Sequence, residues 1–228
     1  MQAISPELTT IDRADTLTDM TYERLRRALI AGAFSPGEKI TIRGIAKIFG
    51  VSPTPARDAL GRLVAERALE MGQNRTVVVP SLNSTKLTEV YRLRLAIEGL
   101  AVEVAAERFD KGGIKELEQI QSELNAALDA KDYKATLEAN EKFHFALYGA
   151  ADMPLASSMI EGLWVQIGPY LNLLYPEFDR TRKGVSAHTA VIRALKKKDG
   201  KAARKAIEQD LEHGRDLLMR HFQAEEES

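Results

Sequence analysis

The histidines are the side chains of this chain whose type and spacing could do chemistry. There are four of them, His144, His188, His213 and His221. Asn140 precedes His144 by four residues, so on one helix both side chains lie on the same face and can converge on one point. His188 and His213 fall at interior-looking positions of two later helical segments. Three imidazoles from three helices could close around one divalent metal, for which Zn²⁺ and Ni²⁺ are suitable.

Spacing alone leaves other interpretations of these residues open. A scattered histidine is more often a packed or exposed residue than a ligand, and we read His221 as a surface residue. A three-histidine site could also activate water as in a metalloenzyme, or the ion itself could be the signal of a metal sensor. Glu138 and Glu141 are near the site in the sequence, but no convergent general base stands out. We therefore do not expect an enzyme.

Basic residues gather toward the N-terminus. Residues 20–80 hold ten Lys and Arg against five Asp and Glu, whereas the whole chain has a formal net charge of -1. The remainder is therefore net acidic. A basic module attached to an acidic one is typical of a polyanion-binding domain on a regulatory body.

The periodicity of the same region predicts a helix-turn-helix. Apolar residues recur at helical spacing in three short segments, and Gly50 closes the second of them. Only Val51, Ser52 and the Pro53-Thr54 pair separate it from the third. Strand-like runs follow at 68–71 and 76–79, around Gly72-Gln73-Asn74. A helix-turn-helix followed by a hairpin is a winged helix, which places its second helix in the DNA major groove.

The outward face of the third segment suits contacts with DNA. After its apolar residues turn inward, the residues left outside are Ser52, Thr54, Arg57, Asp58, Gly61 and Arg62. Hydroxyls at a helix N-terminus can donate to phosphates, and Arg57 can reach bases or phosphates. Arg43 and the hairpin pair Asn74-Arg75 are further candidates for contacts. The same features would also suit a small structural domain with a solvated charged face.

Beyond a linker at residues 80–83 the pattern is helical to the end. The expected helices span residues 84–110, 113–130, 133–151, 154–174, 181–198 and 200–226. Gly168-Pro169 lies inside the fourth, where we expect a kink or a restart. The predicted fold is mainly α, with a flexible N-terminus at 1–15, a winged helix-turn-helix domain at 16–80 and an all-α bundle of six to seven helices at 81–228.

Composition excludes several protein classes. The 228 residues are 44% hydrophobic and 29% charged, as in ordinary globular proteins. The absence of cysteine excludes disulfides, a thiolate nucleophile and a cysteine-ligated zinc finger. No stretch reaches the roughly 18 apolar residues of a membrane span, and the start lacks the layout of a signal peptide. We expect a cytoplasmic protein with no membrane partner.

Two runs near the N-terminus are specific to one family. They are Phe34-Ser35-Pro36-Gly37 and the stretch from Phe49 through Gly50-Val51-Ser52-Pro53-Thr54-Pro55 to Arg57-Asp58-Ala59-Leu60. This region resembles the winged-helix head of GntR-family bacterial transcription regulators. The resemblance implies that Arg43, Ser52, Thr54 and Arg57 contact operator DNA and that Gly72 lies near the wing tip. Glu66-Arg67-Ala68 departs from the Glu-Gly that relatives usually have before the wing.

The helical region carries a second set of motifs. They are Glu89-x-x-x-x-Arg94-x-x-x-Glu98, Asn140-x-x-Phe143-His144, His188 with Ala194-Leu195-x-x-x-Asp199, and His213. This region resembles the FCD class of GntR regulators, in which a carboxylate and three histidines bind a divalent metal. The resemblance implies a metal site of Asn140, His144, His188 and His213, with Asn140 in place of the usual acid. It also implies that Arg94 grips the carboxylate of an effector, although Arg94 could equally pair with Glu98.

Together the resemblances imply a DNA-binding transcription regulator, which we expect to be a bacterial, nucleoid-associated repressor. A small organic acid, assisted by the metal, would control its affinity for DNA. A homodimer is expected, because a palindromic operator presents two copies of one half-site to two recognition helices.

Overall fold

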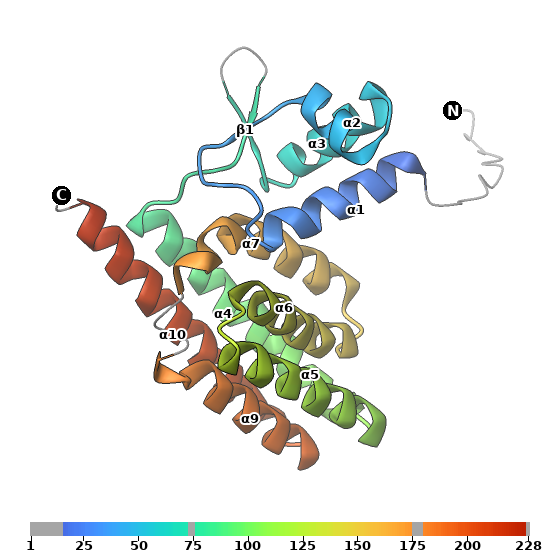
Figure 1. Cartoon of the computed structure of the whole chain (residues 1–228). Coiled ribbons are helices and arrows are strands. Elements are labelled where there is room, and N and C mark those ends of the chain that lie inside the picture. Colours follow the sequence, from blue (N-terminus) through green and yellow to red (C-terminus); the bar gives the residue numbers. More distant parts are fainter. Residues whose placement is uncertain (1–15, 73–75, 175–179, 227–228) are drawn as a thin grey trace, which may run out of the picture.

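The computed structural model describes residues 16–72, 76–174 and 180–226, so the predicted flexible N-terminus at 1–15 lies outside the described residues. A small N-terminal domain, residues 16–80 and hereafter the head, sits on a helical domain, residues 81–226 and hereafter the body (Figure 1). The predicted class, mainly α with a winged helix-turn-helix and a helical body, is confirmed.

The head contains three helices and a small sheet. They are α1 (Leu17–Ile30), β1 (Lys39–Ile40), α2 (Ile42–Phe49), α3 (Pro53–Ala65), β2 (Glu70–Met71) and β3 (Val77–Val78). Thr16 and Asp19 form a capping box that starts α1, and Gly50 ends α2 at φ 66°, in the left-handed region that glycine tolerates. Ser52 is the N-cap of α3 and Pro53 its first residue.

The sheet has one more strand than the predicted hairpin. All its pairs are antiparallel in the order β1-β3-β2, with Val78 opposite both Lys39 and Glu70. The strand β1 escaped prediction because two residues are too few to show an alternating pattern. It ties the turn before α2 to the wing.

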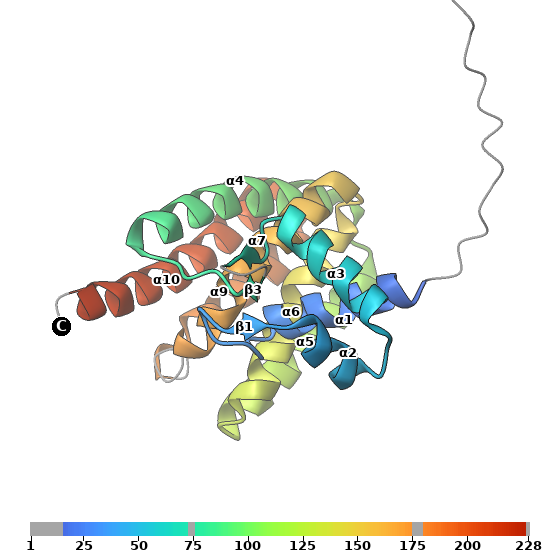
Figure 2. The same cartoon turned by 90° about the horizontal axis from the view of Figure 1, so that it is seen from above.

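Six α-helices make up the described part of the body. They are α4 (Ser84–Arg108), α5 (Lys111–Asp129), α6 (Tyr133–Ala150), α7 (Pro154–Leu171), α9 (Lys183–Lys196) and α10 (Gly200–Glu226), with a 3-10 turn η2 (Asn172–Leu174). Asn83, Asp110 and Asp132 cap three of them by accepting hydrogen bonds from backbone amides. The long helices α4 and α10 pack side by side, as Figures 1 and 2 show.

Helix α7 contains Gly168-Pro169, where the sequence predicts a kink or a restart. It does not restart at Gly168-Pro169 but runs through Pro169 to Leu171 and then tightens into η2. Pro169 has no amide hydrogen to donate to the carbonyl four residues before it, and two more helical residues follow it before the turn tightens. Gly168 has a further role because it lies against the head.

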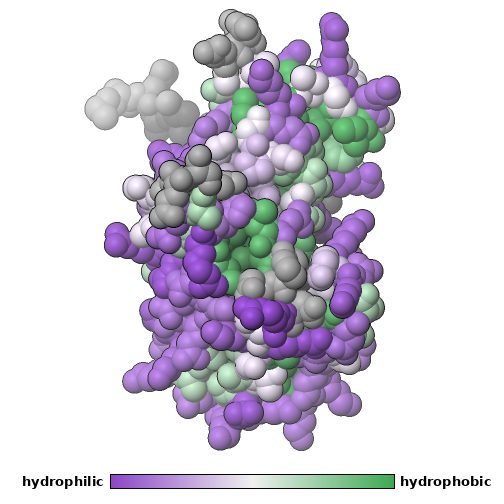
Figure 3. All heavy atoms as spheres, turned by 60° about the vertical axis from the view of Figure 1, so that its left-hand side comes forward, coloured by the Kyte–Doolittle hydropathy of each residue, from purple (hydrophilic) through white to green (hydrophobic). Residues whose placement is uncertain are grey.

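The surface and the interior divide by polarity. The face in Figure 3 is mostly hydrophilic, with a hydrophobic hollow at mid-height, where the head meets the body. None of the described helices combines the length and the apolar character needed to span a membrane.

Among the largest fully buried side chains are Trp164, Tyr91, Tyr148 and Phe143. These aromatic residues surround the polar groups of the body.

The core of the head gives a first test of the fold. Leu63 is fully buried, so Leu63→Ala should lower the free energy of unfolding by about 2–5 kcal/mol through lost burial and a cavity. Ile48 is 68% exposed, so Ile48→Ala should change it by less than about 0.5 kcal/mol. Urea unfolding followed by circular dichroism measures both values, and equal losses would contradict this packing.

Candidate nucleic-acid interface and candidate metal centre

Helix α3 has one buried face and one exposed face. Its buried residues are Pro55, Ala56, Ala59, Leu60 and Leu63. Ser52, Thr54 and Arg57 are exposed, as predicted, and the Ser52 hydroxyl makes no cap hydrogen bond. An added Cβ at Gly61 would meet nothing within 4 Å, so this face is open. The exposed face therefore presents hydroxyls and a guanidinium at one end of the helix.

Arg57 and Arg43 are two exposed cations of the helix-turn-helix. Both side chains are exposed, and neither forms an ion pair or a side-chain hydrogen bond with another described residue. Arg43 lies in the first turn of α2, the helix that precedes the turn. An exposed guanidinium without a partner keeps all its donors for phosphates or base edges.

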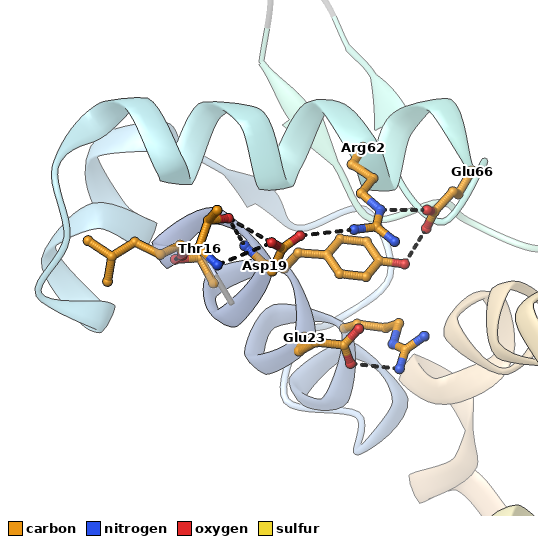
Figure 4. Close-up of polar contacts among 9 residues, drawn as sticks. Thr16, Asp19, Glu23, Arg62 and Glu66 are labelled. Carbon is orange, nitrogen blue, oxygen red and sulfur yellow. Dashed lines mark hydrogen bonds and ion pairs between the residues drawn. The ribbon is translucent and has the colours of Figure 1, made fainter. Parts of the chain in front are cut away.

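Arg62, on the same helix, is held by α1 instead (Figure 4). Its guanidinium carbon lies 3.7 Å from the centre of the Tyr22 ring, and its Nε donates to Glu66 Oε1 at 3.1 Å. Asp19 is 3.6 Å from its Nη1, and the Tyr22 hydroxyl donates to Glu66 at 2.6 Å. Burial and the Glu66 carboxylate raise the pKa of Tyr22 to about 12, so it stays protonated. This contact set fixes α3 on α1.

The wing is described up to its tip. The Gly72 amide donates to the Thr76 carbonyl at 2.8 Å, and an added Cβ would lie 2.7 Å from Val78 Cγ2. Glycine is therefore needed at position 72 because the two strands approach closely there. The predicted contacts Asn74 and Arg75 lie outside the described residues.

Inside the body, three potential metal ligands converge. His144 is on α6, His188 on α9 and Asp210 on α10, and their ligand atoms all lie within 4.8 Å of one another. His144 Nε2 is 3.3 Å from His188 Nε2 and 3.2 Å from Asp210 Oδ2. His188 Nε2 is 3.8 Å from the same oxygen. We call these three residues the cluster.

A buried chain of polar groups sets the tautomer of His144. The Tyr148 hydroxyl donates to Glu98 Oε2, so its oxygen has only lone pairs left for His144. Nδ1 of His144 lies 2.8 Å from that oxygen and must therefore carry the hydrogen. In a neutral imidazole the other nitrogen, Nε2, is then bare. Glu98 in turn accepts from Arg94 Nε at 2.6 Å.

His188 is held in the same tautomer by a different partner. Gln121 uses its amide nitrogen to donate to Asn125 at 3.0 Å, so its oxygen faces His188 Nδ1 at 2.9 Å. Nδ1 of His188 must donate, which leaves Nε2 bare. Burial lowers the pKa of His188 and keeps the ring neutral.

When both rings are neutral, the two Nε2 lone pairs and the Asp210 carboxylate therefore face one point. Asp210 Oδ1 is buried and has no hydrogen-bond partner among the described residues. Two bare nitrogens and a carboxylate are donors of the kind that bind a divalent cation, with both imidazoles oriented by second partners.

Comparison with known proteins identifies both domains. Residues 17–79 match the family described as bacterial regulatory proteins, gntR family, and residues 89–213 match the FCD domain. The chain is 30% identical over 209 residues to the HTH-type transcriptional regulator McbR of Escherichia coli (strain K12), covering 91% of this chain and 95% of McbR. This chain belongs to the GntR family. It is a DNA-binding transcription regulator with an FCD body and not an enzyme.

Other relatives agree with this family. The gluconate operon transcriptional repressor of Bacillus subtilis (strain 168) is 24% identical over 220 residues, covering 91% of this chain and 87% of the repressor. The solved structure of E. coli McbR/YncC has a TM-score of 0.85 at 29% identity and covers 92% of this chain and 100% of that structure.

The four metal ligands predicted from the sequence lie in different environments in the structure. His144 and His188 meet in the cluster. Asn140 lies on α6, one turn before His144, and is partly buried. His213 lies three residues beyond Asp210 on α10, and its Nε2 is 3.4 Å from Thr181 Oγ1. Where residues are described, the group of three potential ligands consists of His144, His188 and Asp210 and does not include His213.

Asp210 is the site residue that sequence reasoning missed. Asp210 is three residues from the predicted ligand His213 and so lies on a neighbouring part of the same helical face. The signal that could have found it is an acidic residue beside the apolar positions Ile207 and Leu211, which are both buried. Acids at such positions are rarely buried without a partner.

Arg94 of this FCD domain is paired inside the body. Its side chain is 3% exposed and that of Glu98 is fully buried, and the two form an ion pair at 2.6 Å. Arg94 also lies over the rings of Tyr91 and Trp164, at 5.0 and 4.9 Å from their centres. The pairing with Glu98, one of the two alternatives for Arg94, is present in the structure.

This buried pair predicts a large stability effect. Glu98→Ala leaves the Arg94 charge buried without a partner, so the free energy of unfolding should fall by about 3–5 kcal/mol. Glu118→Ala removes an exposed partner of Lys196 and should cost about 1 kcal/mol or less. Thermal unfolding of both variants provides the measurement, and similar small losses would show that Arg94 is solvated rather than buried.

Proposed function

We propose that this GntR-family regulator is a repressor that binds a palindromic operator as a homodimer. The observation that carries the proposal is the exposed face of α3. On this face Arg57 is unpaired, whereas Arg62 contacts Tyr22 and Glu66 and so holds α3 on α1. In a winged helix this face enters the major groove, and a two-fold operator needs two copies of it. The repressor assignment is supported by the gluconate operon repressor among the relatives.

The predicted contacts with DNA would have two roles, recognition of base edges and positioning of the head on the DNA backbone. Arg57 would read base edges, because its donors are free and it lies one turn into the helix. Ser52, Thr54 and Arg43 would bind phosphates around the helix-turn-helix. Gly72 would bring the backbone of the wing close to the DNA.

Loss of Arg57 should abolish specific binding without unfolding the head. Arg57→Ala should weaken binding to a duplex selected by the wild-type protein by about tenfold or more, since a bidentate base contact discriminates by about 1–3 kcal/mol. Arg193→Ala removes an exposed arginine from α9 in the body and should leave the affinity unchanged. Fluorescence anisotropy of labelled DNA measures both, and wild-type affinity in Arg57→Ala would remove this residue from the reading face.

In the body, we propose that the cluster holds a divalent metal such as Zn²⁺ or Ni²⁺. His144, His188 and Asp210 would be ligands through Nε2, Nε2 and a carboxylate oxygen, and Asp210 takes the part that the sequence predicted for His213. Asn140 would add a neutral amide oxygen. The fit rests on the two fixed tautomers and on the unpartnered Asp210 oxygen.

A metal would also determine how an organic acid binds. Arg94 is neutralised by Glu98, so a carboxylate effector gripping Arg94 has to compete with a buried ion pair. A divalent ion beside one carboxylate ligand leaves a net positive charge in the body, and such an ion offers open coordination positions to an acid. We therefore propose that a small organic acid binds at the metal, beside Arg94, and that it controls the affinity for DNA.

Trp164 reports on the metal directly. It is the single tryptophan of the chain, and its ring centre lies 5.1 Å from that of His144. Added Ni²⁺ should quench its fluorescence in the wild type, and His188→Ala should weaken Ni²⁺ binding by about tenfold or more by removing a ligand. His221→Ala, outside the cluster, should titrate like the wild type. Unchanged titration of His188→Ala would exclude His188 as a ligand.

A further inference from the structure

Helix α7 forms one wall of the cluster. Trp164, in the middle of this helix, is 1% exposed and packs against the ring of His144 and the guanidinium of Arg94. Its indole Nε1 is buried without a hydrogen-bond partner among the described residues. A close-packed interior has little free space, so a displacement of His144 or Arg94 is passed to Trp164 and hence to α7.

The same helix also packs against the head, and we call this contact between α7 and α1 the seat of the head. Among the described elements, α1 and α7 form the main packed contact between head and body, and Figure 1 shows the C-terminal end of α1 at α7. Glu161 of α7 pairs with Arg26 of α1, which Glu23 also binds at 2.7 Å. Burial alone would lower the pKa of Arg26, but the two carboxylates outweigh burial and raise it. Trp164 is only three residues from Glu161.

Backbone contacts complete this seat. An added Cβ on Gly168 would lie 2.7 Å from Ile30 Cα and would overlap the Leu29 carbonyl oxygen, so the two helices touch through their backbones. The Tyr170 hydroxyl accepts a hydrogen bond from the Leu82 amide at 2.7 Å, within the linker between the domains. A further ion pair across the junction, Lys86 with Glu70 at 2.9 Å, is solvent exposed and holds less strongly.

We propose that α7 transmits the occupancy of the cluster to the DNA-binding head. Trp164 is the contact on the cluster side, and Glu161, Gly168 and Tyr170 hold α1 and the linker on the head side. The inference rests on the proposed metal function. An ion bound by His144, His188 and Asp210 would hold α6, α9 and α10 together and stiffen the wall that contains Trp164. The seat of the head then opens less often, and the head is held in one orientation relative to the body.

The test follows two signals in the full-length protein with Ni²⁺ as the probe. Quenching of Trp164 fluorescence reports occupancy of the cluster. Hydrogen exchange of peptides that contain the Leu82 amide and the end of α1 reports opening of the seat. In the wild type, saturating Ni²⁺ should quench Trp164 and slow exchange in both peptides by about threefold or more.

Gly168→Ala separates the two signals. The added methyl group pushes α1 away from α7, so exchange at Leu82 should be fast and should no longer respond to Ni²⁺, while Trp164 is quenched at wild-type Ni²⁺ concentrations. Gly149→Ala is the matched control, because Gly149 is an exposed helical glycine whose added Cβ would meet nothing within 4 Å. It should behave like the wild type in both signals.

A milder variant protects the test against misfolding. Glu161→Gln removes the charge that binds Arg26 and should at least halve the Ni²⁺-dependent slowing, whereas Glu118→Gln, in an exposed pair within the body, should not change it.

Each outcome decides between the proposals. Quenching of wild-type Trp164 without any slowing of exchange would overturn transmission by α7 while leaving the metal site intact. Slowing of wild-type size in both Gly168→Ala and Glu161→Gln would overturn it as well. Absence of quenching would overturn the metal proposal and, with it, this inference.

Discussion

Two buried hydrogen-bond chains impose the constraint on which the body depends. Arg94, Glu98 and Tyr148 fix the hydrogen of His144 on Nδ1, and Gln121 does the same for His188. The bare nitrogens therefore face each other and the Asp210 carboxylate. Each of the six described α-helices of the body supplies a member of this arrangement or, in the case of α7, Trp164 against it. A cation at the centre would bind the whole bundle together.

In the head, two arginines of α3 have different roles. Arg62 and Arg57 are five residues apart on α3. Arg62 contacts Tyr22 and Glu66, whereas Arg57 forms no ion pair or side-chain hydrogen bond with another described residue. The first positions the recognition helix on α1, and the second is available to DNA. Because α1 also packs on α7, the orientation of α3 relative to the body depends on the same helix that lines the cluster. Helix α7 thus contacts both the head and the cluster.

The sequence predicted those features that repeat along the chain or sit within one turn. Helical spacing was enough for α1 to α3 and for the long helices of the body, and the turn around Ser52 placed Arg57 outside. The two-residue strand β1 was not predicted, because a short strand has no period. Asp210 escaped because convergence of three helices is a tertiary property. The pairing of Arg94 with Glu98 stood as one of two alternatives, and only the packing of the interior shows it formed.

We propose that the cluster binds a divalent metal through two imidazoles. X-ray absorption spectroscopy of the full chain loaded with one equivalent of Zn²⁺ tests it most directly, because the first coordination shell identifies the ligands. We expect two imidazole nitrogens at about 2.0–2.1 Å together with oxygen ligands at about 2.0–2.2 Å. A shell without imidazole scattering, or zinc that is removed by simple buffer exchange, would contradict it.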